Sequence, residues 1–190
     1  MDREEEKNLV KKSRKDPAAF AALFEEYYAP IYRYVLYRAA DPHAAADITA
    51  ETFFKALNKI NSFRFMGAPF SAWLYRIAGN EINTFFRKRK YVPASYEAFG
   101  DSGGLHEIAS KEDIEEEFME AERRIEENKE FKQVRGAMAG LSIKYQEVLV
   151  LRYIEGKKIE EISVITGKKQ GTVKSLISRG VEKLKKTLDK

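Results

Sequence analysis

Residues 159–184 read IEEISVITGKKQGTVKSLISRGVEKL, and this stretch decides the fold of the C-terminal part of the chain. Its first half carries an apolar stripe that predicts a short helix: Ile159, Ile162 and Ile165. Gly167 then supplies a turn, and apolar residues recur at i, i+4, i+8 and i+11 in the second half: Val173, Ile177, Val181 and Leu184. This is the pattern of a helix-turn-helix, in which the helix from about Gln170 to Lys183 enters the major groove of DNA.

The face of the second helix opposite its apolar stripe is polar. Because the apolar positions are buried, this face points outward and offers side chains suited to base edges and phosphates: Lys174, Ser175, Ser178 and Arg179. Thr166 and Lys168 stand where such turns commonly bury an apolar residue, and Lys169 where a Ser-type N-cap is common. The periodicity is also compatible with a four-helix cap that has only a solvated basic face.

Further helices are predicted on both sides of a central acidic stretch. In the C-terminal half, one helix runs from about Glu130 to Ala139 and another from Ser142 to Tyr153, which Gly156 ends. In the N-terminal half, three N-terminal signals each start a helix: Asp16-Pro17, Asp41-Pro42 and Ser71. No strand-like alternation occurs, so the sequence predicts an all-α fold of two small helical domains joined by an acidic linker.

The charges of the chain are segregated into blocks. A net charge of +4 hides +5 over residues 1–90, −9 over residues 91–130 and +8 over residues 131–190. Two basic modules therefore flank an acidic connector, which also contains the loop-forming run from Gly100 to Gly104. The asymmetry suggests that both ends face a polyanion, although a charge run on its own is usually a solvated face.

The composition excludes several classes of protein. The absence of cysteine excludes a disulfide framework, a thiolate metal site and a cysteine nucleophile, and two histidines leave little material for histidine catalysis. Asp47 and Glu51 share a helix face at i and i+4, but no histidine, cysteine or glycine-rich loop accompanies them for acid–base chemistry. We therefore expect a protein that is not an enzyme and that uses no cofactor and no metal.

The distribution of apolar residues bears on location. Residues 1–15 are charged throughout, and no apolar run approaches the ~20 residues that a membrane span needs. We therefore expect no signal peptide and no membrane span, and a cytoplasmic protein.

Four sequence blocks, in order, carry a family resemblance: DITAETFFKAL at 47–57, AWLYRIA at 72–78, VLVLRY at 148–153 and GTVKS at 171–175. Together they resemble a bacterial sigma factor of the extracytoplasmic-function type, in the sigma-70 superfamily. The resemblance implies sigma domain 2 at residues 15–90, an acidic linker at 91–129 and sigma domain 4 at 130–188. It also implies a transcription initiation factor that binds core RNA polymerase and promoter DNA, with an anti-sigma factor as a further partner.

The resemblance assigns roles to particular residues. The helix that grips the clamp helices of the largest polymerase subunit carries Asp47, Ile48, Glu51, Thr52 and Phe53, and the flap of the second-largest subunit is a further contact. The loop from Asn61 to Pro69 and the helix after it open the minus-10 element through Arg64, Phe65, Met66, Arg76, Asn80, Arg87 and Lys88. The last helix reads the minus-35 element through Gln170, Thr172, Lys174, Ser175, Ser178 and Arg179.

The residues of the loop fit such a role on physical grounds. Opening a duplex needs aromatic, cationic and amide groups close together, which offset the cost of unstacking a base. Because alternate positions of an extended loop face opposite ways, we expect Phe63 inside and Phe65 at the rim. Trp73 lies within an apolar helical stripe, so we expect it in the core.

Two departures from the family pattern bear on promoter preference. Leu176 stands where a basic residue is common, so that an apolar contact with a thymine methyl group could replace a phosphate or base contact. Ser142 stands where a proline is frequent.

Two other functions remain open at this point. A regulator that merely occupies DNA would need the C-terminal module alone, and a helical adaptor would not need an exposed Lys174 and Arg179. For the acidic connector we hypothesise that its charge keeps both basic modules off DNA when polymerase is absent. Neutralising the glutamates between Glu112 and Glu127 should then raise polymerase-free DNA affinity, and an unchanged affinity would contradict the hypothesis.

Overall fold

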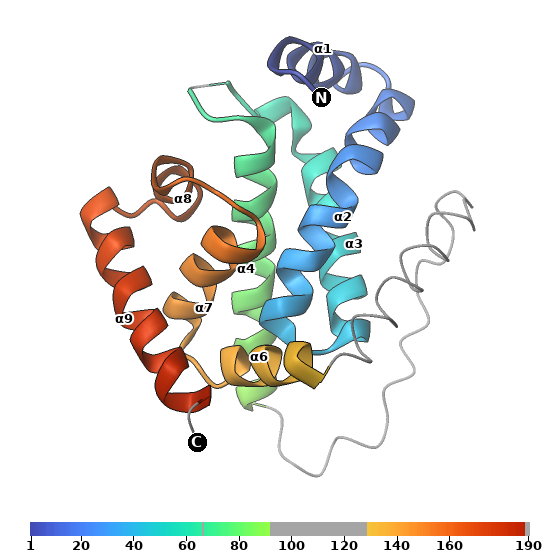
Figure 1. The fold of residues 1–190 in the computed structure, drawn as a ribbon. Helices are drawn as coiled ribbons and strands as arrows, with labels where there is room; N and C mark the ends of the chain where they lie inside the picture. The colour runs from blue at the N-terminus through green and yellow to red at the C-terminus, as the bar shows by residue number, and fades with distance from the viewer. Residues whose placement is uncertain (66, 92–128, 189–190) are drawn as a thin grey trace.

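The computed structural model describes residues 1–65, 67–91 and 129–188 (Figure 1). This described part consists of helices, turns and irregular segments with no strand, so the predicted all-α fold is confirmed for it. The acidic connector predicted at 91–129, except for its two ends, lies outside the described residues. So do the hypothesis on its glutamates and the contact expected of Met66.

The N-terminal module is built from α1 (Arg3–Ser13), α2 (Phe20–Ala39), α3 (Pro42–Asn58) and α4 (Phe70–Tyr91), with short 3-10 turns at Pro17–Ala19 and Ile60–Ser62. Helices α2, α3 and α4 pack against one another, and α1 lies across one end of them (Figure 1). Apolar residues at helical spacing fill the space between them and are closed to solvent: Leu23, Ile31, Val35, Leu74 and Ile82.

Two of the three predicted helix starts of this module are confirmed. The Asp16 carboxylate accepts from the Ala18 N–H at 2.9 Å, and the Asp41 carboxylate accepts from the Ala44 N–H at 3.2 Å. The prediction for Ser71 is wrong, because α4 begins one residue earlier, at Phe70. The Phe70 N–H donates to the Glu6 carboxylate at 3.1 Å, so a side chain from α1 replaces a local cap.

The C-terminal module contains α6 (Lys129–Ala139), α7 (Ile143–Leu149), α8 (Ile159–Thr166) and α9 (Gln170–Leu188). A π-helical segment, Val150–Ile154, continues α7, so the single helix predicted there is present with a wider last turn. Gly156 and Gly167 have φ angles of 63° and 68°. Both lie in the left-handed region that glycine adopts at little cost, which explains why the helices end at these positions.

Helix α9 packs closely on α7 through a glycine. A Cβ atom added at Gly180 would lie 3.0 Å from Cδ1 of the buried Leu149 side chain, so only a residue without a side chain allows this approach. Val173, on the inner face of α9, is fully buried. Residues of α7 and α8 are buried with it: Val148, Leu149 and Ile162. The helix-turn-helix is therefore held rigidly on the rest of its module.

The two modules pack against each other. Helix α4 contacts α8, and α2 contacts α6, α7 and the π-helical segment after it. In Figure 1, α4 accordingly lies between α2 and α3 on one side and α7 and α8 on the other. The buried apolar residues of both modules join in one cluster, so the described residues share a continuous core.

Candidate nucleic-acid interface

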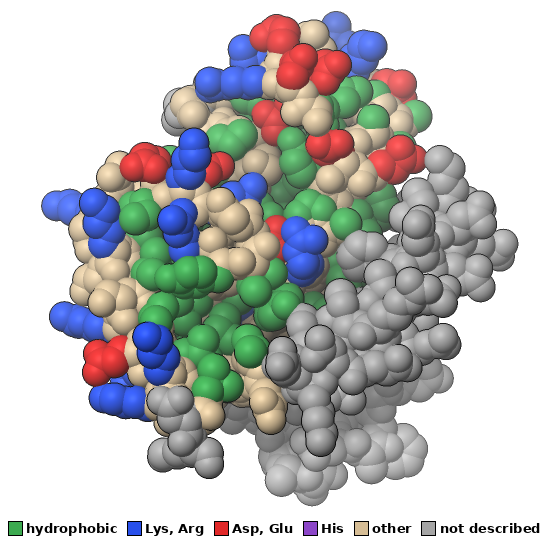
Figure 2. Space-filling model, viewed as in Figure 1, with side chains coloured by type: hydrophobic (Ala, Val, Ile, Leu, Met, Phe, Trp, Pro, Cys, Tyr) green, Lys and Arg blue, Asp and Glu red, His purple; other side chains and the backbone are tan. Residues whose placement is uncertain are grey.

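The residues predicted to read DNA lie on the solvent side of α9. The side chains of Gln170, Thr172, Lys174, Ser178 and Arg179 are exposed, while Ser175 is half-buried. Lys and Arg side chains accordingly gather at the edge of the molecule over α8 and α9 (Figure 2). Leu176 is half-buried and packs against the core, three residues after Val173, so its contact with a thymine methyl group stays a prediction.

Polar side chains hold the turn before α9. The Ser163 hydroxyl donates to the Lys168 carbonyl at 2.6 Å, and the Thr166 hydroxyl donates to the Ile162 carbonyl at 2.7 Å. The Lys168 N–H in turn donates to the Thr166 hydroxyl at 3.4 Å. The polar residues that depart from the usual apolar turn therefore have hydrogen-bond partners, and the turn keeps its shape without an apolar anchor.

The loop before α4 places its aromatic residues as expected. Phe63 is 5% exposed and Phe65 is half-buried, with their ring centroids 4.7 Å apart. Phe63 also contacts the Trp73 ring at 5.1 Å, and Trp73 is half-buried. Arg64 is exposed, and its guanidinium donates to the carbonyls of Asn61 and Phe63 at 2.6 and 3.0 Å. The loop therefore has a buried root and a cationic, aromatic outer edge.

A polar row runs along α4. Arg76, Asn80, Asn83 and Arg87 recur at i, i+4, i+7 and i+11 on one exposed helix face, and Lys88 is exposed beside them. Arg76 is engaged with the other module, because its guanidinium donates to the carbonyls of Val164 and Ile165 at 2.5 and 3.4 Å. Arg76, one of the residues predicted to contact minus-10 DNA, therefore binds the end of α8, the first helix of the helix-turn-helix.

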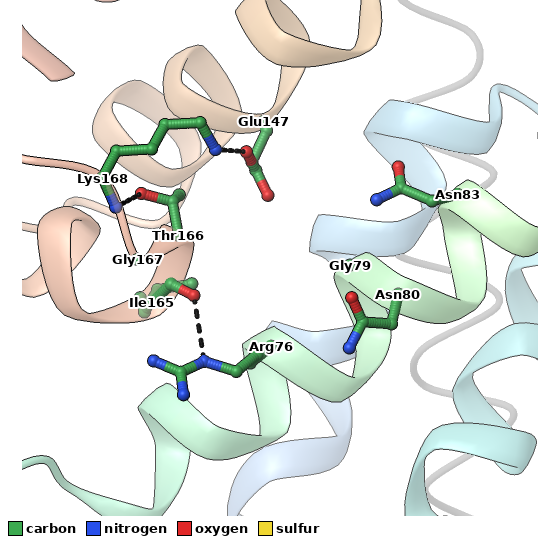
Figure 3. Close-up of a pocket in the computed structure, with 9 residues that line it drawn as sticks. All are labelled: Arg76, Gly79, Asn80, Asn83, Glu147, Ile165, Thr166, Gly167 and Lys168. Atoms are coloured by element: carbon green, nitrogen blue, oxygen red, sulfur yellow. Dashed lines mark hydrogen bonds and ion pairs between the residues drawn. The ribbon is translucent and has the colours of Figure 1, made fainter. Parts of the chain in front are cut away.

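An open pocket of about 300 Å³ lies where α4 meets the helix-turn-helix (Figure 3). On the side of α4 it is lined by Arg76, Gly79, Asn80 and Asn83, and on the other side by Glu147 and residues 165–168. On this second side, the Lys168 ammonium pairs with the Glu147 carboxylate at 2.7 Å. The α4 residues predicted for the minus-10 element thus face the turn that precedes the predicted minus-35 helix.

A buried carboxylate joins the two modules next to this pocket. The Glu155 side chain is 2% exposed, and it accepts two hydrogen bonds from Arg33, at 2.8 and 3.1 Å, and one from the Tyr75 hydroxyl at 2.8 Å. The hydrogen bond to Glu155 raises the pKa of Arg33, and burial together with this carboxylate raises the pKa of Tyr75. At neutral pH Arg33 is therefore charged and Tyr75 donates from its neutral hydroxyl.

Arg38 lies fully buried on α2 behind the pocket. Its guanidinium donates to the Tyr34 hydroxyl at 2.6 Å and lies 5.2 Å from the centre of that ring. Burial raises the pKa of Tyr34 to about 12. Two further contacts join these groups to α4: Arg38 donates to the Asn83 side-chain carbonyl at 3.5 Å, and the Tyr34 and Tyr75 ring centroids are 5.2 Å apart.

The α3 residues predicted to bind polymerase fall into an exposed group and a buried group. Asp47 and Glu51 are exposed on one face, whereas Ile48, Thr52 and Phe53 are buried in the core of the N-terminal module. The Thr52 hydroxyl is satisfied within the helix by the Ile48 carbonyl at 2.7 Å. A surface contact through these three side chains therefore does not fit this fold.

Sequence reasoning missed an exposed aromatic residue on α3. Phe54 is 52% exposed, and it follows Asp47 by seven residues and Glu51 by three, which places all three on one helix face. Its spacing from the two carboxylates was the available signal. The face therefore combines two acidic groups with an aromatic ring.

Among residues 1–65, 67–91 and 129–188, no group of three or more His, Cys, Asp or Glu side chains is arranged to hold a metal ion. In the same residues, no helix is both long and apolar enough to cross a membrane.

A helix-turn-helix packed on a second helical module, with polar rows on both, defines a DNA-binding protein of two modules. The family model described as sigma-70 region 2 matches residues 23–91, and that described as sigma-70, region 4 matches residues 131–184. The chain is 32% identical over 183 residues to the ECF RNA polymerase sigma factor SigW of Bacillus subtilis, covering 96% of both chains. The chain belongs to the sigma-70 family, among the extracytoplasmic-function (ECF) sigma factors.

One further relative agrees with this assignment, and two solved structures share the fold. The chain is 30% identical to the ECF RNA polymerase sigma factor BldN of Streptomyces coelicolor, over 95% of this chain but only 64% of BldN. Among solved structures, CnrH in complex with the cytosolic domain of CnrY superposes with a TM-score of 0.69 at 20% identity, over 97% of each chain. The sigma factor RpoE of Bartonella quintana, in complex with NepR, gives 0.65 at 24% identity, over 90% of this chain and 96% of that one. These two structures share the fold.

Family membership defines the activity. Sigma factors of this family are transcription initiation factors that act with RNA polymerase at specific promoters, and they catalyse no reaction themselves. The regulator and the adaptor considered from the sequence are therefore not supported. The family membership does not assign the roles of single residues.

Proposed function

We propose that the chain divides promoter recognition between its two modules. Residues 15–90 act as sigma domain 2, which binds core RNA polymerase at the clamp helices of the largest subunit and opens the minus-10 element. Residues 130–188 act as sigma domain 4, which reads the minus-35 element and contacts the flap of the second-largest subunit. Residues 91–129 link them.

The observation that carries this proposal is the loop before α4. Phe63 anchors it in an aromatic cluster, while Arg64 and the half-buried Phe65 lie at its outer edge. An unstacked base can stack on an aromatic ring and approach a guanidinium there, which together offset a few kcal/mol of unstacking. The exposed row on α4, with Asn80, Arg87 and Lys88, then follows the backbone of the opened strand.

The surface of α9 supports the other half of the proposal. Its exposed Lys174, Ser178 and Arg179 combine the donors that read guanine and adenine edges with the charge that holds phosphates. The core of the module buries the opposite face of α9, so the helix can enter a major groove without losing its support.

The docking face on α3 is narrower than the sequence predicts. We place the polymerase contact on Asp47, Glu51 and Phe54, because these side chains reach solvent. The buried Ile48, Thr52 and Phe53 support the face from within the module. An aromatic ring beside two carboxylates suits a basic helical partner, since the ring supplies apolar area and the carboxylates supply charge.

Engagement of both promoter elements requires the modules to separate. The elements lie about 25 base pairs apart by their positions, which is roughly 85 Å of B-DNA. In the structure the two modules are packed together instead: α4 and the turn before α9 line one pocket, and Arg76 is bound to α8. Binding of polymerase to both modules supplies the free energy for this opening, in the way that a bivalent partner orders two linked sites.

A protein inhibitor and a cytoplasmic location complete the proposal. The two solved neighbours are complexes with the cytosolic domain of CnrY and with the anti-sigma factor NepR. A partner of this kind fits a chain whose two modules are packed against each other. RNA polymerase acts on the chromosome, so the chain works in the cytoplasm.

Run-off transcription with purified core polymerase and a promoter library tests the proposal. The chain should create specific start sites that core polymerase alone does not produce. Arg64→Ala and Phe65→Ala should reduce transcription from duplex promoters, and Lys12→Ala, at an exposed position of α1, serves as the control. DNA binding without any new start site would support a regulator instead and would contradict the proposal.

A further inference from the structure

Helix α1 contacts both ends of the loop that precedes α4. The match to sigma-70 region 2 begins at residue 23, so α1 lies before it. Val10 on α1 is fully buried against the rest of the module, and α1 lies across the end where the loop emerges (Figure 1). Two polar residues of this segment, Glu6 and Arg14, reach the loop from there.

Glu6 holds the end of the loop. Its carboxylate is buried, with the residue 4% exposed, and it accepts from the Phe70 N–H at 3.1 Å and from the Tyr27 hydroxyl at 2.6 Å. Phe70 is the first residue of α4, where the helix leaves its own N–H groups without partners. A carboxylate at this position satisfies one of these groups and lies at the positive end of the helix dipole. Glu6 therefore fixes the point at which the loop becomes α4.

Arg14 holds the start of the loop. Its guanidinium donates to the Phe63 carbonyl at 2.7 Å, across 49 residues of sequence. Phe63 has an extended backbone, with φ −65° and ψ 138°, so no helix provides a partner for this carbonyl. Arg64 donates to the same oxygen at 3.0 Å. The first turn of the loop is therefore held by two guanidinium groups, one from outside the loop and one from within it.

The rings at the two held positions also touch. The Phe63 and Phe70 ring centroids are 5.3 Å apart, and Tyr27, the partner of Glu6, contacts Phe70 at 6.0 Å. Both ends of the loop are thus fixed by hydrogen bonds to Glu6 and Arg14 and by the packing of these aromatic rings. Arg64 and Phe65 lie on the short segment between them.

We infer that Glu6 and Arg14 are positioning residues for promoter opening, which hold the loop in the shape that receives an unstacked base. The inference rests on the proposed role of this loop. A loop fixed before DNA arrives loses less conformational entropy on binding than a free one, so its contribution to opening is larger. Neither residue needs to touch DNA for this effect, because both act through the backbone of the loop.

Opening of a fluorescently labelled minus-10 element by the full chain with core polymerase tests the inference. Two promoters are compared, a complete duplex and one already mismatched over the minus-10 element. Arg14→Ala should slow opening of the duplex about tenfold, the loss expected for a hydrogen bond from a charged donor. On the mismatched promoter its transcription should be within twofold of the unsubstituted chain, because the work of opening is already done. Arg14→Lys, which keeps a donor, should recover part of the lost rate.

Glu6→Ala and Lys12→Ala complete the design. Glu6→Ala, which removes both hydrogen bonds of the carboxylate, should show the same dependence on the duplex as Arg14→Ala. Lys12→Ala, exposed on the same helix, should match the unsubstituted chain on both promoters. Equal losses on both promoters would mean that the variants are only less stable, and no loss on the duplex would mean that α1 does not position the loop. Either result overturns the inference.

The loop's own variants separate this outcome from failure of the proposed function. If Arg64→Ala and Phe65→Ala open the duplex normally, the proposed role of the loop is wrong. If they fail to open it while Arg14→Ala and Glu6→Ala open it normally, only the role of Glu6 and Arg14 is wrong.

Discussion

The Glu155 carboxylate of the C-terminal module accepts two hydrogen bonds from the Arg33 guanidinium of the N-terminal module, at 2.8 and 3.1 Å. Tyr75 donates to the same carboxylate at 2.8 Å, and Lys157 lies 5.2 Å from the centre of the Tyr75 ring. Glu155 is buried and Arg33 is half-exposed. Because the two residues come from different modules, this ion pair forms only while the modules stay together.

Glu155→Gln should weaken the contact between the modules. The amide keeps the size of the side chain but loses its charge, and its NH2 group faces the donors of Arg33 or Tyr75. We therefore expect the contact between the modules to lose about 1–2 kcal/mol of free energy, a value reduced by the exposure of Arg33. The distance between dyes placed on exposed positions of α1 and α9 should lengthen and broaden. Glu160→Gln, on the exposed side of α8, is the matched control. An unchanged distance distribution in Glu155→Gln would show that apolar packing alone holds the modules.

Two glycines should respond to alanine in opposite directions. At Gly180 a Cβ would lie 3.0 Å from the buried Leu149 side chain, so Gly180→Ala should destabilise the chain by about 1–2 kcal/mol despite its better helix propensity. At Gly136, inside α6, a Cβ would meet nothing within 4 Å, so Gly136→Ala should stabilise the chain by about 0.5–1 kcal/mol. Thermal unfolding of both variants measures the difference. A Gly180→Ala variant as stable as Gly136→Ala would contradict the close packing of α9 on α7.

Stability should fall as the pH rises from 10 to 12. Burial raises the pKa of Tyr34 from 10.0 to about 12, so in this range the folded chain keeps a proton that the unfolded chain has lost. The unfolded state therefore binds fewer protons, and the free energy of unfolding decreases with pH. Tyr34→Phe, which removes the ionisable group, should show a shallower decrease in thermal unfolding midpoint over the same range. Equal slopes for both chains would mean that Tyr34 does not contribute.

Charge removal on α9 should reduce the salt dependence of promoter binding. Each phosphate contact that is lost lowers the slope of log K against log salt by about 1, whereas loss of a base contact costs about 1–3 kcal/mol and relaxes preference at one position. Lys174→Ala and Arg179→Ala can therefore be sorted into phosphate and base contacts by titration of holoenzyme binding at several salt concentrations. Lys185→Ala, exposed in the last turns of α9, is the control. Slopes and preferences that match the control would exclude both residues from the interface.

Local signals in the sequence were sufficient for most of the helices, but α1 (Arg3–Ser13) was not predicted. The Asp41-Pro42 start of α3 and the glycine turn at Gly167 each depend on a few neighbouring residues, and both are confirmed. The start of α4 was misplaced at Ser71 because its cap comes from Glu6, which is 64 residues away from Phe70 in the chain. Contacts at such separation leave no periodic signal.

The same reasoning explains the outcome for the candidate sites. On α9 the apolar stripe separates buried from exposed positions, so Lys174, Ser178 and Arg179 were placed correctly on the outer face. On α3 the family resemblance gave a helix without saying which face is inside, so Ile48, Thr52 and Phe53 were included although they are core residues. The pocket between Arg76 and the helix-turn-helix depends on docking of the modules, which no local pattern predicts.

Base preference at individual promoter positions tests most directly that two modules read two elements. Holoenzymes made with the unsubstituted chain, the double variant Arg64→Ala with Phe65→Ala, and the double variant Lys174→Ala with Arg179→Ala are compared on one randomised promoter library. We expect the Arg64→Ala and Phe65→Ala double variant to lose base preference only within the minus-10 element. The Lys174→Ala and Arg179→Ala double variant should lose it only within the minus-35 element. Loss of preference at both elements in either variant, or at neither element, would contradict this division of promoter recognition.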